Sequence, residues 1–214
     1  MYENILRDIE NDLDKESLRK LFLMIKDSTE IFNDLVGRES DIFSGKFFCS
    51  DIKTRMLNFI ITRAFSPNFL PRNFPFDVEI LSLQGAYHTP KLKKGNTILT
   101  ISKVKNKNKL PSRADYKEEY SRGNLHISEQ LKFVFDEEYS VEGIPYYGIL
   151  GYEFSKDKLK ELNIIVPDEN FKKVVKTIPI PIIHSVKVTE IEEETILDKD
   201  NLKKDILNQI KNLK

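Results

Sequence analysis

The chain has only one cysteine, Cys49, in 214 residues, and no tryptophan. A single cysteine excludes an internal disulfide and a zinc cage built on cysteines, which needs at least two thiolates. The sequence therefore predicts a protein of a reducing compartment, and we expect it in the cytoplasm. Cys49 lies between Phe48 and Ser50. We interpret it as a small buried hydrophobic residue, with a nucleophile activated by a distant histidine as the alternative.

Long apolar runs are also missing. The longest apolar segment, 178–186, is interrupted by Pro179 and Pro181. No stretch reaches the roughly 18 apolar residues that a membrane-spanning helix needs. Residues 1–16 are acidic and carry a charge every few positions, which is not the pattern of a signal peptide. We therefore expect no membrane partner and no export.

The chain has no net charge, because 34 basic residues balance 34 acidic ones. A neutral chain creates no global field that attracts nucleic acid or an anionic membrane, so an electrostatic partner must be bound by a local patch. Hydrophobic residues make up 40% of the chain and charged residues 32%, which favours a folded core beneath a heavily charged surface. The abundance of Lys, Ile and Asn favours AT-rich coding in a bacterium or its mobile elements.

The motifs of several enzyme classes are absent as well. The eight glycines form neither a Walker-type phosphate loop nor a Gly-x-Gly-x-x-Gly turn, so we expect no nucleotide hydrolysis and no Rossmann dinucleotide binding. A Gly-x-Ser-x-Gly elbow for a serine hydrolase is missing too. His88, His126 and His184 lie far apart, and none has a second histidine or cysteine at ligand spacing. We expect no cofactor and no metal; the alternative is a composite metal site built with Asp or Glu.

What the sequence does contain is a pattern of helices at both ends and strands in the middle. Apolar residues at three- and four-residue intervals predict long helices over 2–12, 14–37, 52–64 and 200–213. Runs rich in β-branched residues predict strands over 77–84, 97–104, 145–154, 162–166 and 177–188. We interpret the first two strands as one long hairpin. The predicted fold class is α+β, with a central, mostly antiparallel sheet and N-terminal and C-terminal helices packed around it.

The remaining segments complete this prediction. Three prolines in 67–75 indicate an extended segment whose phenylalanines pack on the core. Residues 106–124 have few apolar side chains and are typical of a long surface loop. Short helices are expected over 128–138 and 168–175. One compact domain should contain all of these segments, as an N-terminal helical part, a β-rich core and a C-terminal helix over 1–66, 67–190 and 191–214.

The most unusual local feature is the charge of residues 91–122. Ten basic residues stand there against three acidic ones, which leaves seven net positive charges. Lysines at alternate positions of a strand project from one face, about 7 Å apart, and such a row can displace counterions from nucleic acid. Nearby tyrosines offer stacking surfaces. The residues predicted to bind a polyanion or protein partner are Lys93, Lys94, Lys103, Lys105, Lys107, Lys109, Arg113, Tyr116, Tyr120 and Arg122.

From this region we predict a non-enzymatic binding protein whose basic β-hairpin and loop engage nucleic acid or an acidic protein partner. The composition and the missing housekeeping motifs favour a phage, prophage or toxin–antitoxin origin. The alternative without any partner is an edge strand and loop that lysines protect from aggregation. The edge-like segment 177–188 and the terminal helices each offer a surface for a homodimer, so the oligomeric state stays open.

A second functional hypothesis comes from two acidic residues and two lysines. Asp77 and Glu79 follow a predicted helix and precede a strand with Lys103 and Lys105 at its end. This order resembles the restriction-like PD-(D/E)xK nucleases, in which two carboxylates hold a divalent metal and a lysine steadies the nucleophile. The positions two before the lysines are Ile101 and Lys103, so the second metal carboxylate is missing. The resemblance implies a divergent metal-dependent nuclease with a degenerate core.

Overall fold

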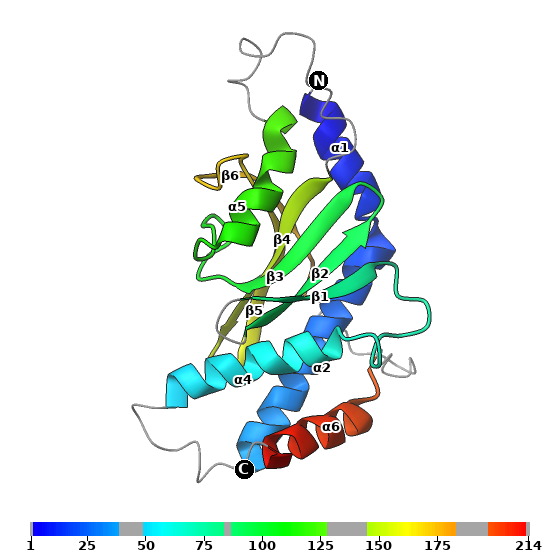
Figure 1. The fold of residues 1–214 in the computed structure, drawn as a ribbon, viewed down its shortest axis with the longest axis vertical. Coiled ribbons are helices and arrows are strands. Elements are labelled where there is room, and N and C mark those ends of the chain that lie inside the picture. The colour runs from blue at the N-terminus through cyan, green and yellow to red at the C-terminus, as the bar shows by residue number, and fades with distance from the viewer. Residues whose placement is uncertain (1, 39–48, 84–86, 128–144, 183–196, 213–214) are drawn as a thin grey trace.

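The computed structural model describes residues 2–38, 49–83, 87–127, 145–182 and 197–212 (Figure 1). Within these ranges the helices are α1 (Tyr2–Asp12), α2 (Lys15–Arg38), α4 (Cys49–Ala64), α5 (Asp115–Ser121), the 3-10 helix η2 (Arg122–Ile127) and α6 (Lys199–Asn212). The strands are β1 (Asp77–Ser82), β2 (His88–Lys94), β3 (Thr97–Lys103), β4 (Tyr146–Ser155), β5 (Lys158–Pro167) and β6 (Val174–Pro179). The predicted α+β class is confirmed.

The six strands form one sheet in which they follow chain order, β1 to β6. Neighbouring strands are antiparallel except β3 and β4, which run parallel with Thr97 opposite Tyr146 and Lys103 opposite Tyr152. A parallel pair needs a crossover connection, and α5 and η2 lie within it. The sheet is therefore mostly antiparallel, as predicted, with one change of direction at its centre.

Two apolar cores cover the two faces of the sheet. The larger core contains residues of α1, α2, α4 and α6 together with Leu99 and Ile164 of the sheet. The smaller core contains Ile98 and Ile165, with Tyr120 of α5 packed against it. Neighbouring side chains of a strand point to opposite faces, so Ile98 and Leu99 belong to different cores. In Figure 1, α1 and α2 run along one side of the sheet and α5 lies on the other.

The long helix α2 begins where the sequence predicts. The backbone N–H of Ser17 donates to Oδ1 of Asp14 at 2.8 Å, which makes Asp14 the N-cap of the helix. The other oxygen of Asp14 binds Nζ of Lys94 at 2.5 Å and so ties the start of α2 to β2. These two interactions hold the pKa of Asp14 down at about 2, and the Lys94 contact has the larger effect.

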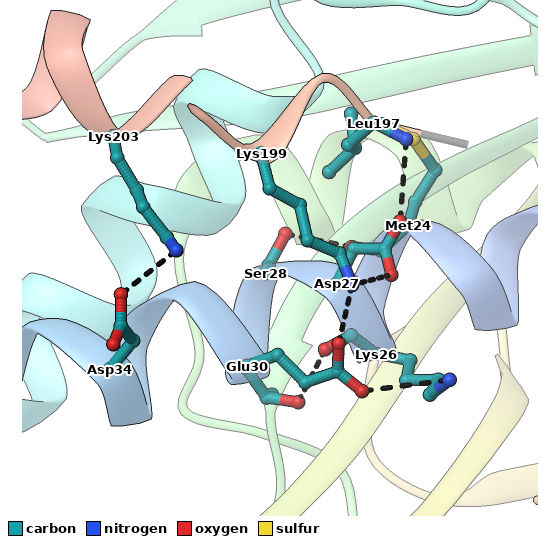
Figure 2. A network of polar contacts seen from close by, with 10 residues as sticks. Met24, Lys26, Asp27, Ser28, Glu30, Asp34, Leu197, Lys199 and Lys203 are labelled. Carbon is teal, nitrogen blue, oxygen red and sulfur yellow. Dashed lines mark hydrogen bonds and ion pairs between the residues drawn. The ribbon is translucent and has the colours of Figure 1, made fainter. Parts of the chain in front are cut away.

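The C-terminal helix α6 is attached to α2 by ion pairs, shown in Figure 2. Nζ of Lys199 lies 3.1 Å from the buried carboxylate of Asp27 and 2.5 Å from Glu30. One turn further along, Lys203 pairs with Asp34 at 2.8 Å. Leu202 and Ile206 of α6 are fully buried in the larger core. Both ends of the described chain therefore contribute to one core. None of the described helices has the length and apolar character needed to cross a membrane.

The region of the predicted hairpin is different in the structure. A further strand, β2, lies between β1 and β3, so the prediction of a single hairpin is wrong and the arrangement is a three-stranded meander. Pro90 and three lysines gave β2 little strand signal. Pro90 pairs with Ile80 of β1, whereas the ladder to β3 starts at Lys91, so the missing N–H removes no bond between β2 and β3.

Two other local predictions are wrong. The expected surface loop 106–124 contains α5 and the first half of η2. The expected helix 168–175 is a turn that leads into β6, and Oδ1 of Asp168 accepts the backbone N–H groups of Lys172 and Lys173. The edge strand that we expected over 177–188 begins earlier, in β6, while 183–188 lie outside the described residues. The helix predicted over 128–138 lies outside them too.

Gly95 closes the turn between β2 and β3 in a way that only glycine permits. Its φ is +56°, and a Cβ there would lie 2.0 Å from Oδ1 of Asp12. Oδ2 of Asp12 accepts the N–H of Asn96 at 2.9 Å and the hydroxyl of Thr97 at 2.8 Å, so moving this side chain away from a Cβ would break both bonds. We expect Gly95→Ala to lower the free energy of unfolding by about 2 kcal/mol, through the backbone strain and the loss of these bonds.

Urea unfolding followed by circular dichroism measures this effect, with Gly37→Ala as the matched control. A Cβ at Gly37 meets nothing within 4 Å, and the residue is in α2. We expect that substitution to be neutral or to stabilise by up to about 1 kcal/mol. Equal effects at the two glycines would contradict the assigned role of Gly95.

Candidate binding cleft

The lysines of 91–122 do not form a single row. The strand β3 ends at Lys103, so Lys105, Lys107 and Lys109 lie in the turns that follow it. The alternation of side chains along a strand, on which the predicted row of lysines depended, therefore stops at Lys103. All of them are exposed, as are Lys93 and Arg122.

Several of these cations are also paired with carboxylates. Three of the partners lie outside residues 91–122, and the fourth, Glu118, lies within them. The pairs are Lys91 with Glu79 (3.0 Å), Lys94 with Asp14 (2.5 Å), Lys107 with Glu161 (3.7 Å) and Arg113 with Glu118 (2.7 Å). Lys91, Lys94 and Lys107 thus hold segments of the fold together and are not free to attract a polyanion, whereas Arg113 binds its neighbour Glu118 through Nε.

Other residues of 91–122 line a cleft in the surface, which we call the binding cleft. The cleft has a volume of about 970 Å³ and opens between α4 and the segment 111–119, over the end of β3. Its lining includes Asn58, Thr62, His88, Thr89, Pro90, Ser102, Lys103, Arg113, Tyr116, Lys117 and Tyr152. Lys103, Arg113 and Tyr116 were predicted site residues, and Lys117 was not.

Lys117 is the least expected member of the cleft. Only 6% of this lysine is exposed. Its Nζ donates to the carbonyl oxygen of Ser112 at 3.0 Å and lies 5.7 Å from the ring centroid of Tyr116. Among the described residues no carboxylate comes within ion-pair distance of it. Burial disfavours the charged amine and lowers the pKa of Lys117 to about 8.

Hydroxyl groups lie next to this lysine. Ser102 on β3 and Thr89 on β2 line the cleft together with Tyr116. Burial raises the pKa of Tyr116 to about 12, against the opposing effect of the Ser102 and Thr89 hydroxyls, so the phenol stays protonated at neutral pH and can donate a hydrogen bond. This side of the cleft therefore combines one buried cation with three neutral hydroxyls.

The wall formed by α5 is held by a buried amide. Asn124, in η2, is fully buried and donates to the carbonyl oxygens of Tyr147 and Pro167, at 2.9 and 2.8 Å. Its own oxygen accepts the N–H of Tyr147 at 2.8 Å. The hydroxyl of Tyr147 in turn lies 2.6 Å from that of Thr100. These bonds fix the end of α5 against β4 and β5.

The opposite wall of the cleft is α4, which is bonded to the sheet. The hydroxyl of Tyr152 on β4 hydrogen-bonds to Oδ1 of Asn58, and burial raises the pKa of this tyrosine. Nζ of Lys103 lies 3.4 Å from the hydroxyl of Thr54. Lys103 also lines a second, smaller cleft of about 220 Å³ together with Lys53 and Lys156. The two clefts share Lys103, at the end of β3, and we refer to them together as the groove.

The residues of the nuclease hypothesis are not brought together. At one end of the sheet, Asp77 of β1 lies opposite Lys93 of β2 in the strand register, and Lys93 lies opposite Ile98 of β3. Lys103 is five positions further along β3, which is about 16 Å at the usual rise of a strand. Glu79 binds Lys91 instead. Within the described part of the chain, no three His, Cys, Asp or Glu side chains are close enough to hold a metal ion.

Comparison with known proteins adds no relative. No protein-family model, no curated protein and no solved structure matches this chain. The function is therefore argued from the cleft alone. Of its residues, the sequence pointed to three through their charge and aromatic character, but it gave no sign that Lys117 and Thr89 are buried or that Ser102 lines the same cleft.

Proposed function

We propose that this protein binds a single strand of nucleic acid in the groove formed by the two clefts that share Lys103. The observation that carries the proposal is an excess of cations in this groove of an otherwise neutral molecule. Its basic residues outnumber its acidic ones, Asp115, Glu119 and Asp157; they are Lys53, Lys103, Arg113, Lys117 and Lys156. Cations along a groove attract a phosphate backbone and release its counterions.

The shape of the groove supports a single strand over a duplex. Lys117 is buried in the larger cleft, between α4 and the segment 111–119, so a phosphate must enter a concavity to reach it. A flexible single strand can do so with its bases turned outwards, whereas a duplex is a rigid rod. Tyr87 lines the cleft and is 51% exposed, which makes it a stacking surface for a base.

The other hypotheses stand differently. An acidic protein partner would meet the same cations, and it is the outcome of the test in which no oligonucleotide binds. The metal-dependent nuclease stays a prediction, because Asp77 and Glu79 lie away from Lys103 and no observation favours a metal between them. A homodimer and a phage, prophage or toxin–antitoxin origin likewise stay predictions.

Binding of short fluorescent oligonucleotides, measured by anisotropy, tests the proposal. We expect oligothymidylate or oligouridylate to bind, more tightly than the matching duplex, and the affinity to fall steeply as salt is added. The double variant Lys103→Glu, Arg113→Glu should lower the affinity about tenfold or more, because it replaces two attractive charges with repulsive ones.

The control carries the same change of net charge elsewhere. Lys172 and Lys173 are exposed in the turn before β6 and line neither cleft. The variant Lys172→Glu, Lys173→Glu should keep nearly all of the affinity. An equal loss in both double variants would show that net charge alone attracts the strand, and the groove would lose its assigned function.

A further inference from the structure

Lys117 has no counter-charge among the residues that the structure describes. An ammonium group removed from water is unfavourable unless it is paired and hydrogen-bonded. Among the described residues, the group has one acceptor, the carbonyl of Ser112, and one aromatic ring, that of Tyr116. Asp115 and Glu119 also line the cleft, but neither forms an ion pair with Lys117. The site thus holds a buried positive charge that another molecule can neutralise.

We propose that Lys117 and the hydroxyls of Tyr116, Ser102 and Thr89 form a phosphate-binding site within the cleft. This inference rests on the proposed function and assigns one phosphoryl group of the bound strand to one place. The anion bound there supplies the counter-charge that the described part of the chain does not provide. Lys103 and Arg113, nearer to solvent, then contact neighbouring phosphates.

The donor set favours a phosphoryl group over a planar carboxylate. A phosphoryl group presents several acceptor oxygens in three dimensions, and a lysine ammonium binds it as a point charge. Hydroxyls donate further hydrogen bonds without adding charge. The guanidinium that could bind a carboxylate with two parallel bonds, Arg113, is already engaged with Glu118 at 2.7 Å.

Such a site makes the affinity depend on pH. The anion binds the protonated form of Lys117, and the pKa of about 8 in the free protein means that this form is lost as the pH rises past 8. Binding should therefore be strongest below pH 8 and weaken up to about tenfold per pH unit above it. The other titratable groups that line the cleft are His88, Lys103, Arg113, Asp115, Tyr116 and Glu119.

Two substitutions isolate the contribution of Lys117 from those groups. Lys117→Arg keeps the positive charge at every pH of the experiment, so affinity should persist and its decline above pH 8 should disappear. Lys117→Gln removes the charge, so affinity below pH 8 should fall about tenfold or more. Titration calorimetry with oligothymidylate from about pH 6.5 to 9.5 measures both, after thermal melts establish that each variant folds.

Three probes distinguish the source of the phosphoryl group. Inorganic phosphate reports on the site alone, a dinucleotide on an internal phosphodiester, and a 5′-phosphorylated nucleotide on a terminal phosphate. Oligothymidylate binding that depends on Lys103 and Arg113 but is unchanged in Lys117→Gln would overturn the site and leave the proposed function. Phosphate binding that requires Lys117, without any oligonucleotide binding, would leave the site and overturn the proposed function. A decline above pH 8 that persists in Lys117→Arg would also overturn the site.

Discussion

Asn124→Asp is expected to lower the free energy of unfolding by about 3 to 5 kcal/mol. The amide of Asn124 donates to two buried carbonyl oxygens, of Tyr147 and Pro167, and both lose their donor in the variant. An aspartate oxygen would then face these carbonyls, and an ionised carboxylate would be buried without a cation. Protonation relieves the charge but supplies at most one donor where the amide supplies two.

Urea unfolding followed by circular dichroism measures the loss, and Asn170→Asp is the control. Asn170 is exposed in the turn before β6, where its amide donates to Glu169 at 2.7 Å. There the same chemical change should cost no more than about 0.5 kcal/mol. A loss below about 1 kcal/mol for Asn124→Asp would mean that η2 does not depend on this amide.

Much of the scaffold could be predicted from the sequence because its signals are local. The helix α2 combines an apolar stripe with an N-cap at Asp14, β4 is rich in aromatic residues, and β5 ends in a β-branched run. Such patterns need no knowledge of what packs against them. The class of the fold and the mostly antiparallel sheet followed from them.

The misses share a physical cause, which is that tertiary contacts override weak local signals. The helix α5, with the sequence DYKEEYS, carries no apolar stripe, yet Lys117 and Ser121 are buried in it. The strand β2 contains Pro90 and three lysines, and it exists because β1 and β3 pair with it on both sides. The local sequence of neither segment therefore predicts its secondary structure.

The same cause explains what could be predicted of the site. A net positive charge over 91–122 is visible in the sequence, but the carboxylates that neutralise Lys94 and Lys107 are Asp14 and Glu161, far away along the chain. Lys117 is buried in the fold, where its Nζ donates to the carbonyl oxygen of Ser112, and the sequence gives no sign of this burial. The number of charges could therefore be read from the sequence. Which of these cations form ion pairs within the fold and which line the cleft could not.

Lys199→Met is expected to lower the free energy of unfolding by about 3 kcal/mol, because it leaves a buried carboxylate without its cation. Asp27 is 1% exposed, and its carboxylate contacts Lys199 Nζ at 3.1 Å and the N–H of Leu197 at 3.3 Å (Figure 2). Burial raises the pKa of Asp27, against the opposing effect of Lys199. Without the lysine, that pKa must rise further.

A double-mutant cycle and a pH series test this account together. Asp27→Asn in the Lys199→Met background should restore part of the lost stability, because the unpaired charge is gone. The cost of Lys199→Met should shrink as the pH falls through the raised pKa of Asp27, since the folded variant then gains a proton that neutralises the carboxylate. Lys203→Met provides the control: its partner Asp34 is more exposed, so about 1 kcal/mol or less is expected. Equal costs for the two lysine substitutions would place the attachment of α6 in its apolar contacts, Leu202 and Ile206, and not in the pair with Asp27.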